Sequence, residues 1–306
     1  MRKLASQGKA RFLWAVLLSA VLVVLSSCGL GGRTAKRARM ATAVPSATIA
    51  PLIASIDGDA TPLPKIGEST IPTSVLACPE RTGTLRPESV ASTILGSDLG
   101  FFVYLPPCYD AQPQTTFPVV YLFHGLGRTP DQWIALGLTE TADQMIVTGE
   151  IPPLLIVLPY VAGEDSSDAA FLADLLPSVN DRFRTRADRP FRSIGGISRG
   201  AEWALRLAMR RADLFGMVGL HSIAFSDGAL AQIQVWAAAV PETMRPSVFA
   251  DVGYADPMRS QTEDLLRMFD SLQWPRESRF QPGDHSDDYW RGNLREYLRG
   301  YGSHWK

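Results

Sequence analysis

Neither sign of charge is in excess in this chain. Its 306 residues carry 30 Lys and Arg against 31 Asp and Glu, which gives a formal net charge of −1. Proteins that bind nucleic acids usually gather a strongly basic surface. We therefore expect no nucleic-acid partner, and the composition says nothing about the oligomeric state.

Potential metal ligands are also scarce. The chain contains three Cys and four His, and no group of them has the spacing of zinc ligands. We therefore expect no structural metal and no cofactor.

Aromatic side chains are missing from a long stretch near the N-terminus, since no Phe, Trp or Tyr occurs between Trp14 and Phe101. Within this stretch, residues 29–77 are rich in Ala, Thr, Ser and Pro. Such a segment cannot bury enough apolar surface to offset the entropy lost on ordering. We expect residues 29–77 to form a disordered tether ahead of a folded domain at 78–306.

The first 28 residues have the pattern of an export signal. A basic start is followed by the apolar segment Phe12–Leu25, which is short for a membrane span. The segment ends in Leu25-Ser26-Ser27-Cys28, which resembles a bacterial lipobox. We expect a lipoprotein signal peptide, with Cys28 lipidated and the domain held on the outer face of the bacterial cell membrane. An ordinary signal peptide or a short anchor is the alternative.

The two remaining cysteines, Cys78 and Cys108, make an even pair in a domain expected to be exported. Such a pair favours a disulfide, which would stabilise the domain by about 3–4 kcal/mol. Two free buried thiols are the alternative.

The rest of the chain alternates between short apolar runs and amphipathic stretches. Expected strands are 86–95, 101–105, 117–123, 154–159, 192–197, 217–221, 247–252 and 278–281. Expected helices are 130–147, 169–183, 201–211, 257–272 and 287–301. This alternation predicts an α/β fold with a mostly parallel, doubly wound sheet covered by helices on both faces.

A possible nucleophile, Ser198, lies in the sequence Gly196-Ile197-Ser198-Arg199-Gly200, between an expected strand and an expected helix. This context is typical of a nucleophile elbow, in which a tight turn exposes the serine hydroxyl. The glycines lack a Cβ and allow the strand and the helix to approach closely. A glycine-rich turn with an incidental serine is the alternative.

The partners of such a serine follow it in the order acid, then histidine. His285 lies in a polar turn ahead of the last expected helix, whereas His304 is two residues from the C-terminus. Asp256 lies on a loop just past a strand end, whereas Asp251 lies inside that strand. We therefore predict His285 as the general base and Asp256 as its carboxylate.

An acyl-transfer site also needs amide donors for the oxyanion. The amide of Arg199 follows the nucleophile directly, and the glycine-rich loop after the third strand offers the amide of Leu126. We predict these two amides as the oxyanion hole.

Several stretches together resemble one known family. They are Val103–Pro107, Val119–Gly125, Asp174–Pro177, Gly196–Gly200, Asp251–Asp256, Gly283–His285 and Tyr289–Trp290. In this order they are similar to esterase D-type α/β hydrolases, which include feruloyl and acetylxylan esterases, enterochelin-type esterases, S-formylglutathione hydrolases and mycolyltransferases. The resemblance implies an α/β-hydrolase fold and assigns Ser198, Asp256 and His285 to the triad. It departs at Arg199, where many relatives carry a smaller or aromatic residue, but only the amide is needed there.

The family resemblance implies a serine carboxylic-ester hydrolase. Because the N-terminal segment predicts export, we expect its substrate to be an extracytoplasmic ester, either a small molecule or a carbohydrate ester. Trp133, Tyr160 and Trp290 are candidates for the substrate pocket, with core or rim packing as the alternative for each. An acyltransferase of the mycolyltransferase type and an inactive hydrolase fold used as a surface binding module remain alternatives.

Overall fold

The computed structural model describes residues 78–160 and 165–305. The predicted signal peptide, the lipidation site Cys28 and the predicted tether lie outside the described residues. Within the described part, no helix combines the length and the apolar character that a membrane span requires.

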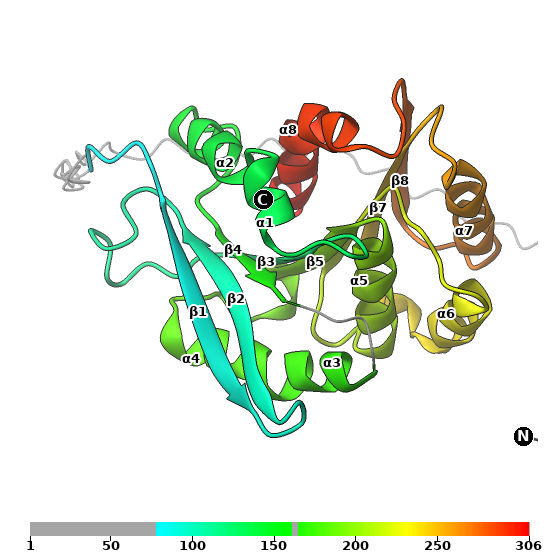
Figure 1. Ribbon diagram of the computed structural model, residues 1–306, viewed down its shortest axis with the longest axis horizontal. Coiled ribbons are helices and arrows are strands. Elements are labelled where there is room, and N and C mark those ends of the chain that lie inside the picture. The colour runs from blue at the N-terminus through cyan, green and yellow to red at the C-terminus, as the bar shows by residue number, and fades with distance from the viewer. Residues whose placement is uncertain (1–77, 161–164, 306) are drawn as a thin grey trace, which may run out of the picture. The chain divides into compact units, whose positions relative to one another are not determined.

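A single sheet with the strand order β1-β2-β4-β3-β5-β6-β7-β8 forms the centre of the described chain (Figure 1). Its strands are β1 (Thr84–Ser92), β2 (Ser97–Leu105), β3 (Val119–Phe123), β4 (Leu155–Pro159), β5 (Arg192–Ile197), β6 (Met217–His221), β7 (Ser247–Gly253) and β8 (Arg276–Gln281). Strand β2 pairs antiparallel with both β1 and β4. The strands β3 to β8 all run parallel to one another. The predicted α/β fold is confirmed.

The central strands β3 to β6 are buried along their whole length. Continuous burial requires apolar side chains on both faces, which is why these strands appear in the sequence as uninterrupted apolar runs. The strands β5 and β6 have the predicted bounds, whereas β1 begins and ends two or more residues earlier than expected.

Helices cover both faces of the sheet (Figure 1). They are α1 (Asp131–Ala135), α2 (Leu138–Val147), α3 (Asp165–Ala170), α4 (Leu176–Arg182), α5 (Arg199–Arg210), α6 (Ala229–Ala239), α7 (Arg259–Ser271) and α8 (Asp287–Ser303). One core cluster includes Leu205 of α5, Ile233 of α6 and Phe269 of α7. The other includes Met145 of α2 and Tyr297 of α8.

Two predicted helical stretches differ from the structure, and one helix was not expected. The expected helix 130–147 is two helices, because Gly137 between them takes a left-handed conformation with φ of 86°. The expected helix 169–183 begins at Asp165 and contains a π-helical turn, Phe171–Leu175. Helix α6 was not predicted.

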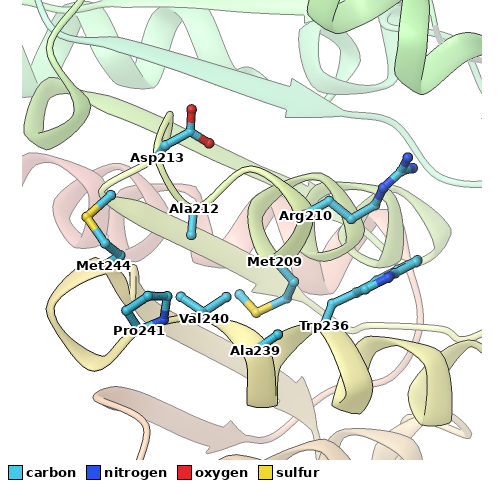
Figure 2. Close-up of a pocket in the computed structure, with 9 residues that line it drawn as sticks. All are labelled: Met209, Arg210, Ala212, Asp213, Trp236, Ala239, Val240, Pro241 and Met244. Carbon is cyan, nitrogen blue, oxygen red and sulfur yellow. The ribbon is translucent and has the colours of Figure 1, made fainter.

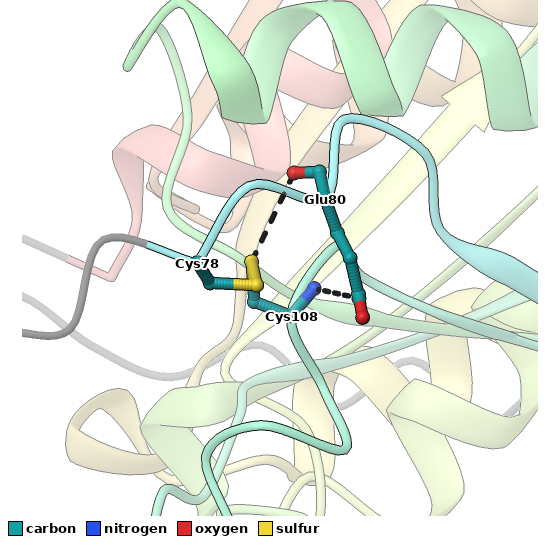
Figure 3. A group of neighbouring side chains, drawn as sticks. All are labelled: Cys78, Glu80 and Cys108. Carbon is teal, nitrogen blue, oxygen red and sulfur yellow. Dashed lines mark hydrogen bonds between the residues drawn. A yellow bond between two sulfur atoms is a disulfide. The ribbon is translucent and has the colours of Figure 1, made fainter.

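Cys78 and Cys108 form a disulfide, as predicted (Figure 3). The bond connects the first described residue to the segment that follows β2. Glu80 lies beside it, and its carboxylate accepts a hydrogen bond from the Cys108 amide at 2.9 Å. Glu80 and the two cysteines together form a cluster of potential metal-binding atoms. The two sulfur atoms of this cluster are, however, already bonded to each other.

Candidate active site

Ser198 lies at the turn between β5 and α5 with φ of 56° and ψ of −122°. Residues with a Cβ rarely adopt a positive φ, and such strain persists only where the surroundings hold it. Here the Ser198 amide donates to the carbonyl of His221 at 2.8 Å, and the Ser198 carbonyl accepts from the amide of Ala224 at 3.2 Å. The last residue of β6 and the loop after it thus hold the strained turn from both sides.

Two glycines make this turn possible. A Cβ on Gly196 would lie 2.4 Å from the carbonyl carbon of Gly200, and a Cβ on Gly200 would lie 2.4 Å from the His124 carbonyl oxygen. Both contacts are with backbone atoms, which cannot move aside as a flexible side chain can. The expected close approach of strand and helix is present at both positions.

Ser198, His285 and Asp256 lie within hydrogen-bonding distance of one another in a row. His285 Nε2 lies 2.9 Å from Ser198 Oγ, and His285 Nδ1 lies 3.0 Å and 3.1 Å from the two carboxylate oxygens of Asp256. The His285 side chain is 23% exposed and that of Asp256 is fully buried. An imidazole in this position can take a proton from the serine while the carboxylate fixes its tautomer.

Asp256 is held in its ionised form by its neighbours. Burial by itself would raise the pKa of Asp256, but hydrogen bonds from His285 and from the Met258 amide, the latter at 2.7 Å, outweigh it. The pKa of Asp256 is therefore below its usual value. A carboxylate that stays charged at neutral pH can stabilise an imidazolium beside it.

Asp251, the competing carboxylate, is fully occupied elsewhere. It lies inside β7, where it bonds to His221 Nδ1 at 2.7 Å and accepts from the hydroxyls of Tyr289 at 2.8 Å and Tyr297 at 3.0 Å. The pleat fixes its side chain, as the sequence suggested. His221 is a buried histidine with partners on both ring nitrogens, since Nε2 lies 3.1 Å from the Tyr301 hydroxyl.

The loop after β3 passes beside the serine. A Cβ on Gly125 would lie 3.7 Å from the Ser198 Cβ, and the next residue, Leu126, is 68% exposed. No described residue accepts a hydrogen bond from the Leu126 amide. The amide of Arg199 opens helix α5 and has no acceptor within the helix. Both amides are therefore free to bind an oxyanion.

A pocket of about 370 Å³ opens over Ser198 and His285. Its lining residues are Gly125, Leu126, Arg128, Gln132, Ser198, His285, Ser286, Asp287 and Trp290. Arg128 and Asp287 form an ion pair at 3.0 Å, so the loop after β3 contacts the start of α8. The sequence did not indicate Arg128, Gln132 or Asp287, although each lies within a few residues of a predicted site residue.

Of the three aromatic candidates for the pocket, Trp290 lines it, with its ring edge-to-face against His285 at 5.0 Å between centroids. A pocket role for Trp133 is wrong, because its side chain has no exposed surface and its indole N–H donates to the Phe123 carbonyl at 3.1 Å. Tyr160 is exposed, hydrogen-bonds Asp131 and is not among the residues that line this pocket.

A second pocket, of about 500 Å³, lies between α5 and α6 (Figure 2). Its walls are largely apolar and include Met209, Val240 and Met244, with Arg210 stacked over Trp236 at its edge. It shares no lining residue with the pocket over Ser198.

The chain is similar to proteins of known class. A family model described as "Putative esterase" matches residues 92–301. An endo-1,4-beta-xylanase/feruloyl esterase of Xylanibacter ruminicola is 29% identical over 136 residues, which cover 39% of this chain and 19% of that protein. The esterase Rv1288 of Mycobacterium tuberculosis is 29% identical over 146 residues, covering 43% of this chain and 30% of the relative. These matches thus span less than a third of either curated relative.

A solved ferulic acid esterase superposes with a TM-score of 0.66 at 20% identity, covering 74% of this chain and 99% of that chain. This similarity confirms the α/β-hydrolase fold. The family match extends from the end of β1 to the last turns of α8 and so includes the whole candidate site. The chain therefore belongs to the esterase family of α/β hydrolases.

Proposed function

We propose that this protein is a serine esterase that cleaves carboxylic esters through an acyl-enzyme on Ser198. The observation that carries the proposal is the row of hydrogen bonds from Ser198 through His285 to Asp256 at the floor of an open pocket. Family membership supports the same reaction class.

In the first half-reaction, His285 Nε2 takes the proton of Ser198 Oγ as the oxygen attacks the ester carbonyl carbon. The carbonyl oxygen becomes an oxyanion, which accepts hydrogen bonds from the amides of Leu126 and Arg199. When the tetrahedral intermediate collapses, the bond to the alcohol oxygen breaks and His285 returns the proton to that oxygen.

In the second half-reaction, water takes the place of the alcohol. His285 accepts a proton from the water as its oxygen attacks the acyl carbon, and the carboxylic acid leaves as Ser198 recovers its proton. Asp256 keeps its charge throughout and stabilises the imidazolium.

The proposed substrate is an extracytoplasmic ester of moderate size, small or attached to a carbohydrate. The aromatic wall at Trp290 and the volume of about 370 Å³ suit a compact acyl or aromatic group. The relatives named as feruloyl esterases support an ester of this kind.

The test is a panel of small carboxylic esters and acylated oligosaccharides assayed with the wild-type chain and with Ser198→Ala. We expect hydrolysis by the wild type and a loss of about 10⁴-fold or more in kcat in the variant. Supplying alcohols with the ester separates hydrolysis from acyl transfer, because an acyltransferase forms the new ester faster than the free acid.

The proposed location follows from the N-terminal sequence, with residues 1–28 as signal peptide, Cys28 as lipid anchor and residues 29–77 as tether. Replacing Cys28 by serine should abolish the incorporation of a labelled fatty acid into the protein without changing its hydrolysis of soluble esters. A wild-type protein that takes up no label, or a Cys28→Ser protein that still takes it up, would contradict the lipid anchor.

A further inference from the structure

The side-chain amide of Gln132 forms hydrogen bonds with two separate parts of the candidate site, one through its oxygen and one through its nitrogen. It lies in α1, is only 7% exposed, and its Oε1 accepts a hydrogen bond from the Gly125 amide at 2.9 Å. Its Nε2 donates to Oδ1 of Asp287 at 3.3 Å. The side chain thus connects the loop after β3 to the first residue of α8.

The chemistry of the two partners fixes the orientation of this amide. A backbone N–H can only donate, so it must face the Gln132 oxygen, and a carboxylate can only accept, so it must face the Gln132 nitrogen. A glutamate would bind Gly125 equally well but would repel Asp287. An aliphatic side chain of similar length would bind neither partner.

This connection acts on the loop that carries one of the proposed oxyanion donors. Gly125 directly precedes Leu126, and its carbonyl accepts from the Arg128 amide at 3.1 Å, which closes a tight turn around Leu126. Arg128 also pairs with the second oxygen of Asp287 at 3.0 Å. Asp287 therefore binds one end of the turn directly, at Arg128, and the other end through Gln132. It lies two residues after His285.

We propose that Gln132, together with Asp287, is a positioning residue that holds the Leu126 amide in the geometry needed to bind the oxyanion. The inference rests on the proposed esterase function. Gln132 does not touch the reacting atoms and acts through Gly125, so its loss should weaken transition-state binding and leave substrate binding unchanged.

The loss of kcat on replacing Gln132 should not exceed the loss caused by removing the Leu126 amide that Gln132 positions. Removing an oxyanion donor altogether lowers the rate by about 10²–10³-fold. A donor that is present but misaligned should give a smaller loss, so we expect Gln132→Met to lower kcat by about 10- to 100-fold with KM changed less than about twofold. Gln144→Met, an exposed glutamine on α2, is the matched control and should match the wild type.

A charge exchange separates positioning from simple damage to the fold. Gln132→Glu keeps the acceptor for Gly125 but places a carboxylate against Asp287, and we expect it to lose activity as Gln132→Met does. Adding Asp287→Asn restores a donor opposite the new carboxylate. The double variant should recover kcat by about tenfold over Gln132→Glu, as expected for two groups in contact.

Amide hydrogen exchange measures how firmly the loop after β3 is held, independently of catalysis. In the full chain, amides of the peptide 124–128 should exchange faster in Gln132→Met than in the wild type, and the double variant should return toward the wild-type rate. Unchanged loop exchange, or faster exchange with wild-type kcat, would overturn the proposal. If the wild type hydrolyses no ester, the proposed function fails, and loop exchange still decides whether Gln132 holds the turn.

Discussion

Two aspartates five positions apart, Asp251 and Asp256, each bond to a buried or half-buried histidine, yet only one faces the serine. The position within the strand decides the difference. Asp251 is inside β7 and stabilises contacts between the sheet and α8, whereas Asp256 is on the loop beyond the strand and reaches His285.

Replacing each aspartate by asparagine should therefore have a different consequence, a loss of activity at Asp256 and a loss of stability at Asp251. Asp256→Asn should lower kcat by about 10⁴-fold with little change in stability, because the imidazole loses its tautomer control. Asp251→Asn should lower the free energy of unfolding by about 1–3 kcal/mol, because at least one buried donor loses its acceptor. Urea denaturation and ester hydrolysis measured on both variants check this. A stable, inactive Asp251→Asn protein would reassign the acid.

Glycine at position 200 is required by contact with backbone atoms, whereas Gly292, on the exposed side of α8, has nothing within 4 Å of its Cβ position. Gly200→Ala should lower the free energy of unfolding by about 1–3 kcal/mol through overpacking. Gly292→Ala should raise it by about 0.5–1 kcal/mol, because alanine favours a helix. The two variants can be compared by urea denaturation, and equal effects at the two sites would contradict the close approach of β5 and α5 at Gly200.

At the residue scale, the sequence predicted the three side chains that the structure places in one hydrogen-bonded row, but not the residues around them. Ser198, Asp256 and His285 each follow a recognisable strand, so their positions at one edge of the sheet could be predicted. Gln132 and Asp287 are 155 positions apart, and nothing local indicates that they meet. Trp133 has the same local context whether it lines a pocket or the core, and only packing decides.

At the scale of elements, buried strands and amphipathic helices were predictable, and helix α6 was not. Its sequence, Ala229–Ala239, is apolar almost throughout, so it shows no polar face with helical spacing, and Val235 is 63% exposed. The run of Ala and Gln after Gly228 was the available signal, through helix propensity alone. The break at Gly137 was missed because the apolar pattern continues across it.

The disulfide connects Cys78, the first described residue, to Cys108, which lies just after β2. Its cysteines are separated by 30 positions, and closing a loop of this length should stabilise the domain by about 3–4 kcal/mol in the chain-entropy model. The double variant Cys78→Ser with Cys108→Ser should therefore unfold at a lower temperature. A reducing agent should lower the melting temperature of the wild type to that of the variant and leave the variant unchanged. A wild type insensitive to reduction would contradict this prediction.

At the scale of the whole molecule, the candidate site is assembled from loops that follow β3, β5, β7 and β8 at one edge of the sheet. Parallel strands bring their carboxyl ends together there, which explains how residues from Leu126 to His285 come to share one pocket. In the proposed scheme, residues 1–77 export the protein and anchor it to the membrane, and the domain at 78–306 carries out the reaction.

Every step of the proposed reaction depends on an activated nucleophile at Ser198, which a fluorophosphonate would label covalently. The full chain should be labelled at Ser198, while Ser198→Ala and His285→Ala should not be labelled although they remain folded. A folded wild-type protein that resists labelling, or one labelled at another residue, would show that Ser198 is not activated and would favour a binding module on a hydrolase fold.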